Sequence, residues 1–252
     1  MPFSALSRAA VLAVSLLLTA VPGTHAATLH QTGTIEALSA GDYARRAPVA
    51  AVLRQGDFGL GTFDDLNGEL VILDGVAYQV TLDGVVHRVR PDQGTPFAQV
   101  VRFAGSLDLG RVDGLDLAAL GKTLAARLPD PSRMCAVRVD GAFAALTVRS
   151  VPAQSQPWPT LAEALTKQRT YALENQRGTL VGFYTPSSLP ALSSPGWHFH
   201  YLSNDRAKGG HVLALTTGPT KARGEAVDAL DVRYSFAPLP RREVAKPAAG
   251  TE

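Results

Sequence analysis

The amino-acid sequence predicts a β-rich α+β fold. Its 252 residues include 23 glycines and 17 prolines, which favour many turns and short strands over long helices. Asp-Gly pairs separate several runs of β-branched residues, which is the pattern of β-hairpins. Helical spacing is confined to a few short segments. With 46% hydrophobic and 18% charged residues, the chain can bury a large core, and this composition excludes disordered and collagen-like proteins.

The charge of the chain gives no sign of a polyanionic partner. There are 24 basic and 22 acidic residues, a formal net charge of +2, and both signs are spread along the sequence. A protein that binds nucleic acid concentrates positive charge on one face or in one stripe. We therefore expect no nucleic-acid partner.

The first 26 residues have the organisation of a secretory signal. Arg8 is their only charged residue, and it precedes an apolar run at residues 9–20 that Pro22 ends. Thr24 and Ala26 then place small residues at the positions that a signal peptidase inspects. The run of about 12 residues is shorter than the roughly 20 that span a bilayer, although a retained anchor is the alternative. The sequence predicts cleavage after Ala26, export to the periplasm or the medium, and no membrane attachment afterwards.

Cys135 is the only cysteine of the chain. The exported protein can therefore form no internal disulfide bond, and its stability must come from the core or from a bound metal. Cys135 lies in an apolar run that is typical of a buried strand, so core packing is favoured over a catalytic thiol.

The N-terminal part is predicted to begin with a strand, a weak helix and a glycine-rich loop. Residues 28–34 alternate between polar and apolar, and residues 39–46 have weak helical character. Residues 56–63 contain Gly56, Gly59 and Gly61. They lack the Lys-Ser/Thr ending of a phosphate-binding P-loop and the strand-loop-helix context of a dinucleotide fold. We therefore expect a loop whose backbone shapes a substrate site.

A β-meander is predicted next. Three strands separated by two Asp-Gly turns are expected at residues 69–73, 76–82 and 85–89. A further strand is expected at residues 96–103. Residues 115–127 carry leucines at helical spacing and end before Pro129, which predicts a helix. Strands at residues 134–139 and 142–150 follow, joined by a turn at Asp140 and Gly141.

The C-terminal part is predicted to form a second unit. A polar, proline-containing stretch at residues 154–159 suggests a seam, and Thr160 with Glu163 begins a short helix that ends near residue 168. Three more strands are expected at residues 178–184, 197–203 and 211–217. The chain is therefore divided into a signal at 1–26, a sheet domain at 27–152, a second domain at 153–240 and a mobile tail at 241–252.

Three histidines lie close together in the last two of these strands. His198 and His200 are separated by one residue, so both side chains lie on one face of a strand, and aromatic residues occupy the other face. His211 begins the next strand after a glycine-containing loop. It joins the other two if it pairs opposite an even-numbered residue such as His200, whereas a slip of one residue turns it away.

Three imidazoles without a fourth protein ligand are typical of a catalytic zinc site. The alternative is that these histidines are packed or exposed without a metal. Three of the six histidines of the chain fall within fourteen residues, and this clustering favours metal binding. We expect Zn²⁺ as the cofactor, held by His198, His200 and His211.

Several separate motifs resemble the acetolactate decarboxylase family, in order, from about residue 33 to residue 215. The motifs are GDFGLGTFD at 56–64, LNGEL at 66–70, TPF at 95–97, AVRVDGAF at 136–143, RGTLVGF at 177–183, GWHFH at 196–200 and GGH at 209–211. Agreement among several motifs is far more specific than any one of them.

This resemblance implies a fold and a reaction. The implied fold is an N-terminal mixed β-sheet, which can continue across a homodimer, plus a C-terminal antiparallel β-barrel that carries the metal. The implied reaction converts 2-acetolactate, a small 2-hydroxy-3-oxo acid, to acetoin and CO₂. In it, zinc chelates the substrate carbonyl and hydroxyl and stabilises the enediolate left when CO₂ departs.

The resemblance also implies roles for single residues. The matched positions are His198, His200 and His211 as zinc ligands, Glu69 and Arg138 as catalytic residues, and Thr62 as a substrate-binding hydroxyl. The residues alone leave alternatives: Glu69 could be an exposed strand residue, and Arg138 could be an ion-pair partner on a packed strand.

The resemblance fails at the C-terminus. Family members return a further glutamate to the metal site from a longer tail, and Glu243 matches neither its spacing nor its context. Two other functions therefore stay open. One is an exported metal-binding or inactive homologue without turnover, and the other is a zinc hydrolase or hydratase that uses a zinc-bound hydroxide.

Overall fold

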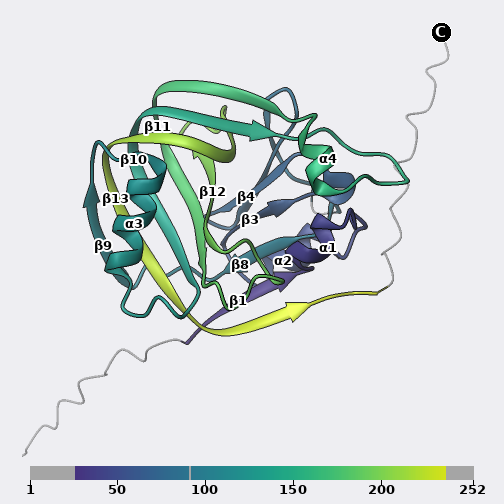
Figure 1. Ribbon diagram of the computed structural model, residues 1–252, viewed down its shortest axis with the longest axis horizontal. Helices are drawn as coiled ribbons and strands as arrows, with labels where there is room; N and C mark the ends of the chain where they lie inside the picture. The colour runs from purple at the N-terminus through teal and green to yellow at the C-terminus, as the bar shows by residue number, and fades with distance from the viewer. Residues whose placement is uncertain (1–25, 91, 237–252) are drawn as a thin grey trace, which may run out of the picture.

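The structure is a computed structural model that describes residues 26–90 and 92–236 (Figure 1). The strands of its N-terminal part are β1 (Ala27–Thr32), β2 (Ala47–Pro48), β3 (Phe58–Thr62), β4 (Glu69–Leu73), β5 (Val76–Val80), β6 (Val86–Arg88), β7 (Gly94–Thr95), β8 (Ala98–Val101) and β9 (Leu107–Val112). The later strands are β10 (Cys135–Ser150), β11 (Arg169–Thr185), β12 (Gly196–Ser203) and β13 (Gly209–Arg233). The helices are α1 (Ile35–Ser39), α2 (Val49–Leu53), α3 (Leu117–Arg127), α4 (Leu161–Leu165) and the 3₁₀ turn η1 (Asp64–Leu66).

One eleven-stranded sheet dominates the fold. Its order is β10-β11-β12-β13-β1-β8-β3-β4-β5-β6, with β9 attached to β13, while β2 and β7 form a separate pair. β1 runs parallel to β13, and the other strand pairs of the described sheet are antiparallel, so the predicted mixed sheet is confirmed. β10 also pairs with β13, which closes β10, β11, β12 and β13 into an antiparallel ring.

The ring and the N-terminal strands each contribute to the core. Inside the ring, Val139, Phe143, Phe199 and Tyr201 pack together, and α3 covers this cluster with leucines. A second cluster lies between the ring and the N-terminal sheet, where side chains of β1, β3 and β4 meet those of β10, β11 and β12. In Figure 1, α3 and β9 lie on one side of β12, and β3, β4 and β8 lie on the other.

Several predicted elements are confirmed. The meander is β4, β5 and β6, and its first turn places Asp74 and Gly75 at positive φ, as a tight hairpin requires. The predicted helix at 115–127 is α3, which Asp116 caps by accepting a hydrogen bond from the Ala119 backbone. The helix after Thr160 is α4, and both hydrogen bonds of its capping box with Glu163 are present.

The weak helix predicted at residues 39–46 is wrong. The helix instead occupies Ile35–Ser39, because the Thr34 hydroxyl accepts a hydrogen bond from Ala37 N and so starts it earlier. It ends at Ser39 with Ala40 as its C-cap, and Gly41 follows with a positive φ of 89°.

The predicted glycine-rich loop is in fact mostly the buried strand β3. A side chain at Gly59 would lie 2.3 Å from the Gln99 carbonyl oxygen, and one at Gly61 would lie 2.2 Å from the Phe97 oxygen. The glycines therefore serve close approach of β3 to β8, rather than turning the chain.

The predicted turn at Asp140 and Gly141 does not form. β10 continues through both residues, and Gly141 pairs with Gly178 on one side and Thr220 on the other. Pairing with β11 on one edge and with β13 on the other stabilises the extended backbone of β10 at these residues. Local turn propensity could not predict this, because both partner strands are distant in sequence. A side chain at Gly141 would lie 2.4 Å from the Pro219 oxygen, so glycine is required there for packing.

The predicted domain boundary at residues 152 and 153 stays a prediction. β10 lies before it in sequence and belongs to the same ring as β11, β12 and β13. Of the signal predicted at residues 1–26, residues 1–25 lie outside the described residues, as do the tail at 241–252 and Glu243. No helix within residues 26–90 and 92–236 is both long and apolar enough to cross a bilayer.

Candidate metal centre and active site

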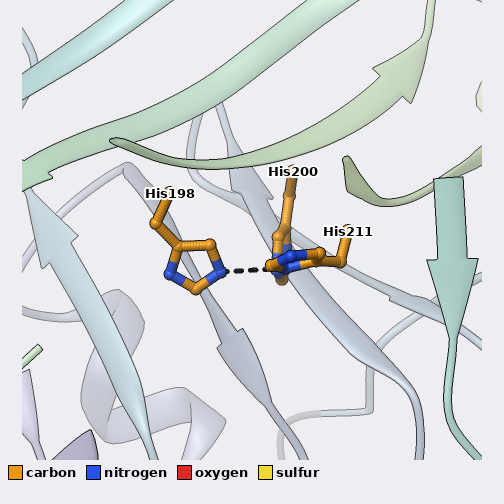
Figure 2. A group of neighbouring side chains, drawn as sticks. All are labelled: His198, His200 and His211. Carbon is orange, nitrogen blue, oxygen red and sulfur yellow. Dashed lines mark hydrogen bonds between the residues drawn. The ribbon is translucent and has the colours of Figure 1, made fainter. Parts of the chain in front are cut away.

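The three histidines come together where the ring meets the N-terminal sheet. His198 and His200 lie on β12, and His211 lies near the start of β13. The register pairs His200 with His211, which brings all three to one face. One nitrogen from each ring lies within 4.8 Å of the other two, and His198 Nε2 is 3.1 Å from His211 Nδ1 (Figure 2). The predicted histidine cluster is confirmed.

These histidines point away from the inside of the ring. Phe199 and Tyr201, which alternate with them along β12, are buried in the ring core. The histidine face is turned toward β4, whose Leu70 carbonyl accepts a hydrogen bond of 2.9 Å from His200 Nδ1. The cluster therefore lies between the two halves of the fold and not within the ring.

The nitrogen atoms of the cluster fit a bound metal ion. Because His200 Nδ1 donates to a carbonyl, Nε2 of the neutral ring carries a lone pair. This Nε2 has no hydrogen-bond partner and faces Glu69 Oε2 at 3.5 Å. A buried lone pair that faces a carboxyl oxygen is unfavourable unless a proton or a cation lies between them. His198 Nδ1 is also buried without a partner.

Burial keeps the three imidazoles neutral. It lowers the pKa of His198 from 6.5 to about 4, and the nearby positive charge of Arg149 acts in the same direction. The pKa values of His200 and His211 lie well below 6.5, because of burial first and the neighbouring His198 second. Neutral imidazole is the form that binds metal ions.

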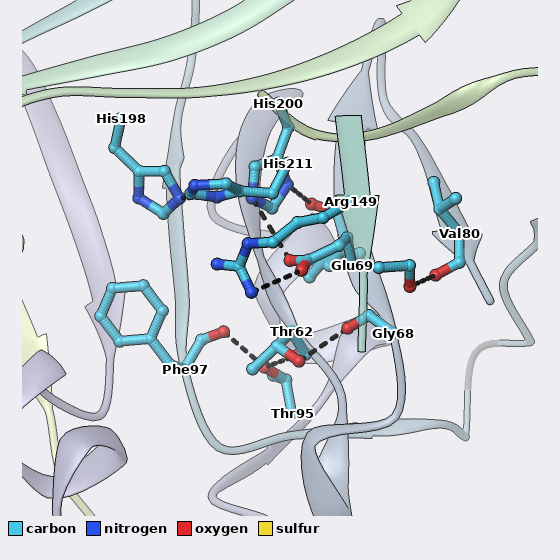
Figure 3. A network of polar contacts seen from close by, with 12 residues as sticks. Thr62, Gly68, Glu69, Val80, Thr95, Phe97, Arg149, His198, His200 and His211 are labelled. Atoms are coloured by element: carbon cyan, nitrogen blue, oxygen red, sulfur yellow. Dashed lines mark hydrogen bonds and ion pairs between the residues drawn. The ribbon is translucent and has the colours of Figure 1, made fainter. Parts of the chain in front are cut away.

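Glu69 is a buried carboxyl group beside the histidines. It begins β4, and the residue is only 5% exposed, so the alternative of an exposed strand residue is wrong. Its Oε1 lies 3.7 Å from Arg149 Nη1 (Figure 3). Burial raises the pKa of Glu69 from 4.5 to about 7, although the positive charge of Arg149 opposes this rise. A carboxyl group of this kind can hold or release a proton near neutral pH.

Thr62 lies directly across from Glu69, because the two residues pair in the register of β3 and β4. Its hydroxyl donates a hydrogen bond of 2.7 Å to the Gly68 carbonyl, and its own carbonyl accepts one of 2.7 Å from Thr95 Oγ1 (Figure 3). The Thr62 hydroxyl is therefore held in one orientation at the cavity wall. Its proton is used by Gly68, so its oxygen lone pairs are left to accept a hydrogen bond.

Arg149 is the site residue that sequence reasoning missed. It pairs with His211 across β10 and β13, and its side chain is mostly buried. Side chains alternate between the two faces of a strand, so Val139 and Phe143 in the ring core predict that residue 148 faces away from it. Val148 is nevertheless in the ring core, so the alternation along β10 is shifted by one residue before this point. Register shifts between residues 141 and 148 cause this change and turn Arg149 to the histidine face. The only feature of the sequence that could have indicated Arg149 as a site residue is that it is an arginine inside an apolar strand.

Arg138 lies at the other end of the same strand. Its guanidinium contacts Asp140 Oδ2 at 2.8 Å and Asp74 Oδ1 at 2.6 Å. About eleven residues of extended chain, roughly 36 Å along the strand, separate it from Arg149, and it does not line the histidine cavity. This corrects the expected placement of the active-site arginine. The structure shows the ion-paired arrangement that the sequence had left as the alternative.

The site opens into a cavity of about 260 Å³. Its polar side consists of Thr62, Glu69, Arg149, Ser194, His198, His200 and His211. Its apolar side consists of Ile35 and Leu38 from α1, Leu161 and Leu165 from α4, and Leu66, Phe97 and Val151. A small polar molecule with short alkyl groups matches these two walls.

The chain is similar to known proteins over most of its length. The sequence profile named alpha-acetolactate decarboxylase matches residues 29–237. The alpha-acetolactate decarboxylase of Methanosarcina mazei is 40% identical over 208 residues, which is 82% of this chain and 70% of that protein. The one from Methylococcus capsulatus is 36% identical over 82% of this chain and 77% of that protein.

A solved structure shows the same fold. The crystal structure of alpha-acetolactate decarboxylase from Bacillus subtilis strain 168 superposes with a TM-score of 0.81 at 28% identity, covering 83% of this chain and 90% of that one. The profile match at residues 29–237 includes the strands that carry the histidines, Glu69 and Arg149. The chain belongs to the alpha-acetolactate decarboxylase family.

Proposed function

We propose that this protein decarboxylates 2-acetolactate to acetoin and CO₂. The observation that carries the proposal is the single cavity in which three neutral imidazoles, Glu69 and Arg149 converge. Membership of the family favours this reaction, because the matched relatives are named for it.

The three histidines would hold Zn²⁺. Three neutral nitrogen ligands without a thiolate form the usual ligand set of catalytic zinc, and the only cysteine, Cys135, is buried in the ring core. When bound, the ion supplies Lewis-acid stabilisation of negative charge on the substrate oxygen atoms. The hydrogen bond from His200 Nδ1 to Leu70 O fixes the tautomer that leaves Nε2 free to bind.

Arg149 binds and orients the substrate. Its planar guanidinium presents paired N–H donors that suit a carboxylate or two neighbouring oxygen atoms. The bond between C2 and the carboxylate breaks, CO₂ leaves, and the electron pair moves into the adjacent carbonyl to give an enediolate. A fixed positive charge beside the developing oxyanion stabilises this charge in a cavity that excludes most water.

Glu69 supplies the proton that completes the reaction. The carbon that loses CO₂ must gain one proton to become the CH(OH) group of acetoin. Glu69 holds a proton near neutral pH, since burial raises its pKa to about 7, and it lies across from the Thr62 hydroxyl. Protonation from one fixed carboxyl group would deliver the proton to one face of the planar intermediate.

An acetoin assay with zinc analysis tests the proposal. Zinc-loaded protein is mixed with racemic acetolactate, and we expect acetoin and CO₂ in equal amounts. His198→Ala and His200→Ala should have strongly reduced zinc content, and wild-type zinc content in both would contradict the ligand assignment. Zinc binding without acetoin would instead favour a metal-binding homologue without turnover. Activity on an ester or a dehydration substrate in place of acetolactate would favour a zinc hydrolase or hydratase.

We also propose that the protein is exported. The support is the pattern of the first 26 residues, in which one basic residue, an apolar run and small residues at Thr24 and Ala26 follow in order. Fractionation of cells that express the full-length chain would test this. Protein in the periplasm or medium is expected, and protein confined to the cytoplasm would contradict the proposal.

A further inference from the structure

The first residue of β1 makes a specific contact to the far end of the chain. The backbone nitrogen of Ala27 donates a hydrogen bond of 2.7 Å to Asp228 Oδ2, which belongs to β13. Ala27 is 8% exposed, whereas Ala26 before it is exposed. Among the residues that the structure describes, Ala27 is thus the first buried one.

Asp228 is held in place for this contact. Arg133 Nη2 donates to its other oxygen, Oδ1, and also donates to the Val227 carbonyl at 2.8 Å. One arginine therefore fixes both the carboxylate and the backbone beside it. Such an arrangement presents a negatively charged oxygen at the point where β1 begins.

The cleavage site predicted from the sequence falls at the same peptide bond. We propose that a signal peptidase hydrolyses the bond between Ala26 and Ala27 and that the new α-ammonium group of Ala27 binds Asp228 as an ion pair. Water is consumed, the new carboxylate stays on the released residues 1–26, and the amide nitrogen becomes the ammonium. The proposal rests on export and not on the decarboxylation reaction.

Cleavage would strengthen the contact in two ways. The amide N–H is neutral and has a single hydrogen, whereas an ammonium group carries a full positive charge and three donors. The hydrogen bond to Asp228 uses one of these donors. Ala27, Thr28 and Glu225 also line a cavity of about 490 Å³, so water can reach the start of β1.

This ion pair would secure the joint between the two halves of the protein. β1 pairs in parallel with β13 of the ring on one edge and with β8 of the N-terminal sheet on the other. The ring carries the histidines and Arg149, and the N-terminal sheet carries Thr62 and Glu69. An anchor at the start of β1 therefore holds together strands that build one site.

The first test is the N-terminal sequence of the protein exported from its full-length precursor. We expect it to begin Ala27-Thr28-Leu29. A different first residue would overturn the assigned cleavage site.

The second test measures the ion pair without depending on export. A chain that begins at Ala27, released from a fusion protein by a specific protease, is compared with one that keeps Gly-Ser before Ala27. Each is made with Asp228 and with Asp228→Asn. The chain with Ala27 first should melt about 1 to 4 °C higher, as expected for one partly exposed ion pair, and Asp228→Asn should abolish this difference.

Asp231→Asn is the matched control, since Asp231 also lies on β13 beside β1 but contacts His30 instead. It should change the melting temperature of both chains by the same amount. Equal melting temperatures for the two starting points, or a difference that survives Asp228→Asn, would overturn the ion pair.

Discussion

Among the single residues of the site, Glu69 and Arg149 are two buried ionisable groups, and the charge of Arg149 affects the pKa of Glu69. Glu69 Oε1 and Arg149 Nη1 are 3.7 Å apart, and both side chains are mostly buried. Burial raises the pKa of Glu69 to about 7, while Arg149 lowers it, so the carboxyl group stays within reach of neutral pH. In the proposed mechanism, proton delivery by Glu69 and substrate orientation by Arg149 would both depend on this contact.

We predict that Arg149→Lys lowers the rate of acetoin formation by about 100-fold or more, because lysine keeps the charge but loses the planar pair of donors. Zinc content should stay unchanged. Arg138→Lys is the matched control on the same strand, and it should keep wild-type turnover. Loss of activity in Arg138→Lys alone would return the substrate role to Arg138.

We predict that Glu69→Gln lowers kcat by about 10²-fold to 10⁴-fold, because the amide has the same shape but cannot deliver a proton. Acetoin formation and zinc content are measured together on the same samples. Glu174→Gln, an exposed glutamate of β11, serves as the control. Wild-type kcat in Glu69→Gln would show that another group protonates the intermediate.

At the scale of elements, short helices complete a site that strands begin. α4 has only five residues, too few to be stable alone, and it supplies Leu161 and Leu165 to the cavity wall. Its capping box with Thr160 and Glu163 satisfies the free N–H groups at its start.

We predict that Thr160→Ala loosens α4, since loss of an N-cap costs about 1 kcal/mol. Amide hydrogen exchange of residues 161–166 should become roughly fivefold faster. KM for acetolactate should rise, because part of the apolar wall opens. Thr166→Ala at the other end of the helix is the control, and equal exchange rates in both variants would contradict a special role for the cap.

At the scale of the whole molecule, the site joins two halves of the fold, so its ionisation affects folding. The three imidazoles have lower pKa values in the folded protein than in the unfolded chain, where about 6.5 is usual. The unfolded chain therefore takes up more protons as the pH falls below 6.5. Glu69 acts in the opposite direction between pH 4.5 and 7, because its folded pKa is raised.

We predict that the metal-free protein loses stability as the pH is lowered from about 6.5 toward 4, because three histidines outweigh one glutamate in that range. Thermal unfolding in the presence of a chelator measures this dependence. His198→Gln should make the dependence on pH shallower, since one titrating group is removed. An identical pH dependence in the variant and the wild type would contradict the assignment.

The sequence by itself determined which residues are compatible with metal binding and where most strands lie. His198 and His200 share a face because side chains alternate along a strand, and the Asp-Gly turns of the meander follow from backbone conformations that few residues adopt. These features are local, so the order of residues is enough to predict them. The same is true of the capping box at Thr160, because its two partners are three residues apart.

Which arginine lines the histidine cavity, and where that cavity lies, depends on the tertiary structure. Arg138 and Arg149 are both arginines in apolar runs, and the register shifts of β10 against β13 turn Arg149 to the histidines. The glycines at 59, 61 and 141 suggested a loop or a turn in the sequence. In the structure each lies in a strand, and the backbone of a neighbouring strand approaches it closely. The pairing of His200 with His211 and the position of Glu69 likewise depend on strands distant in sequence, whose register comes from packing between the ring and the N-terminal sheet.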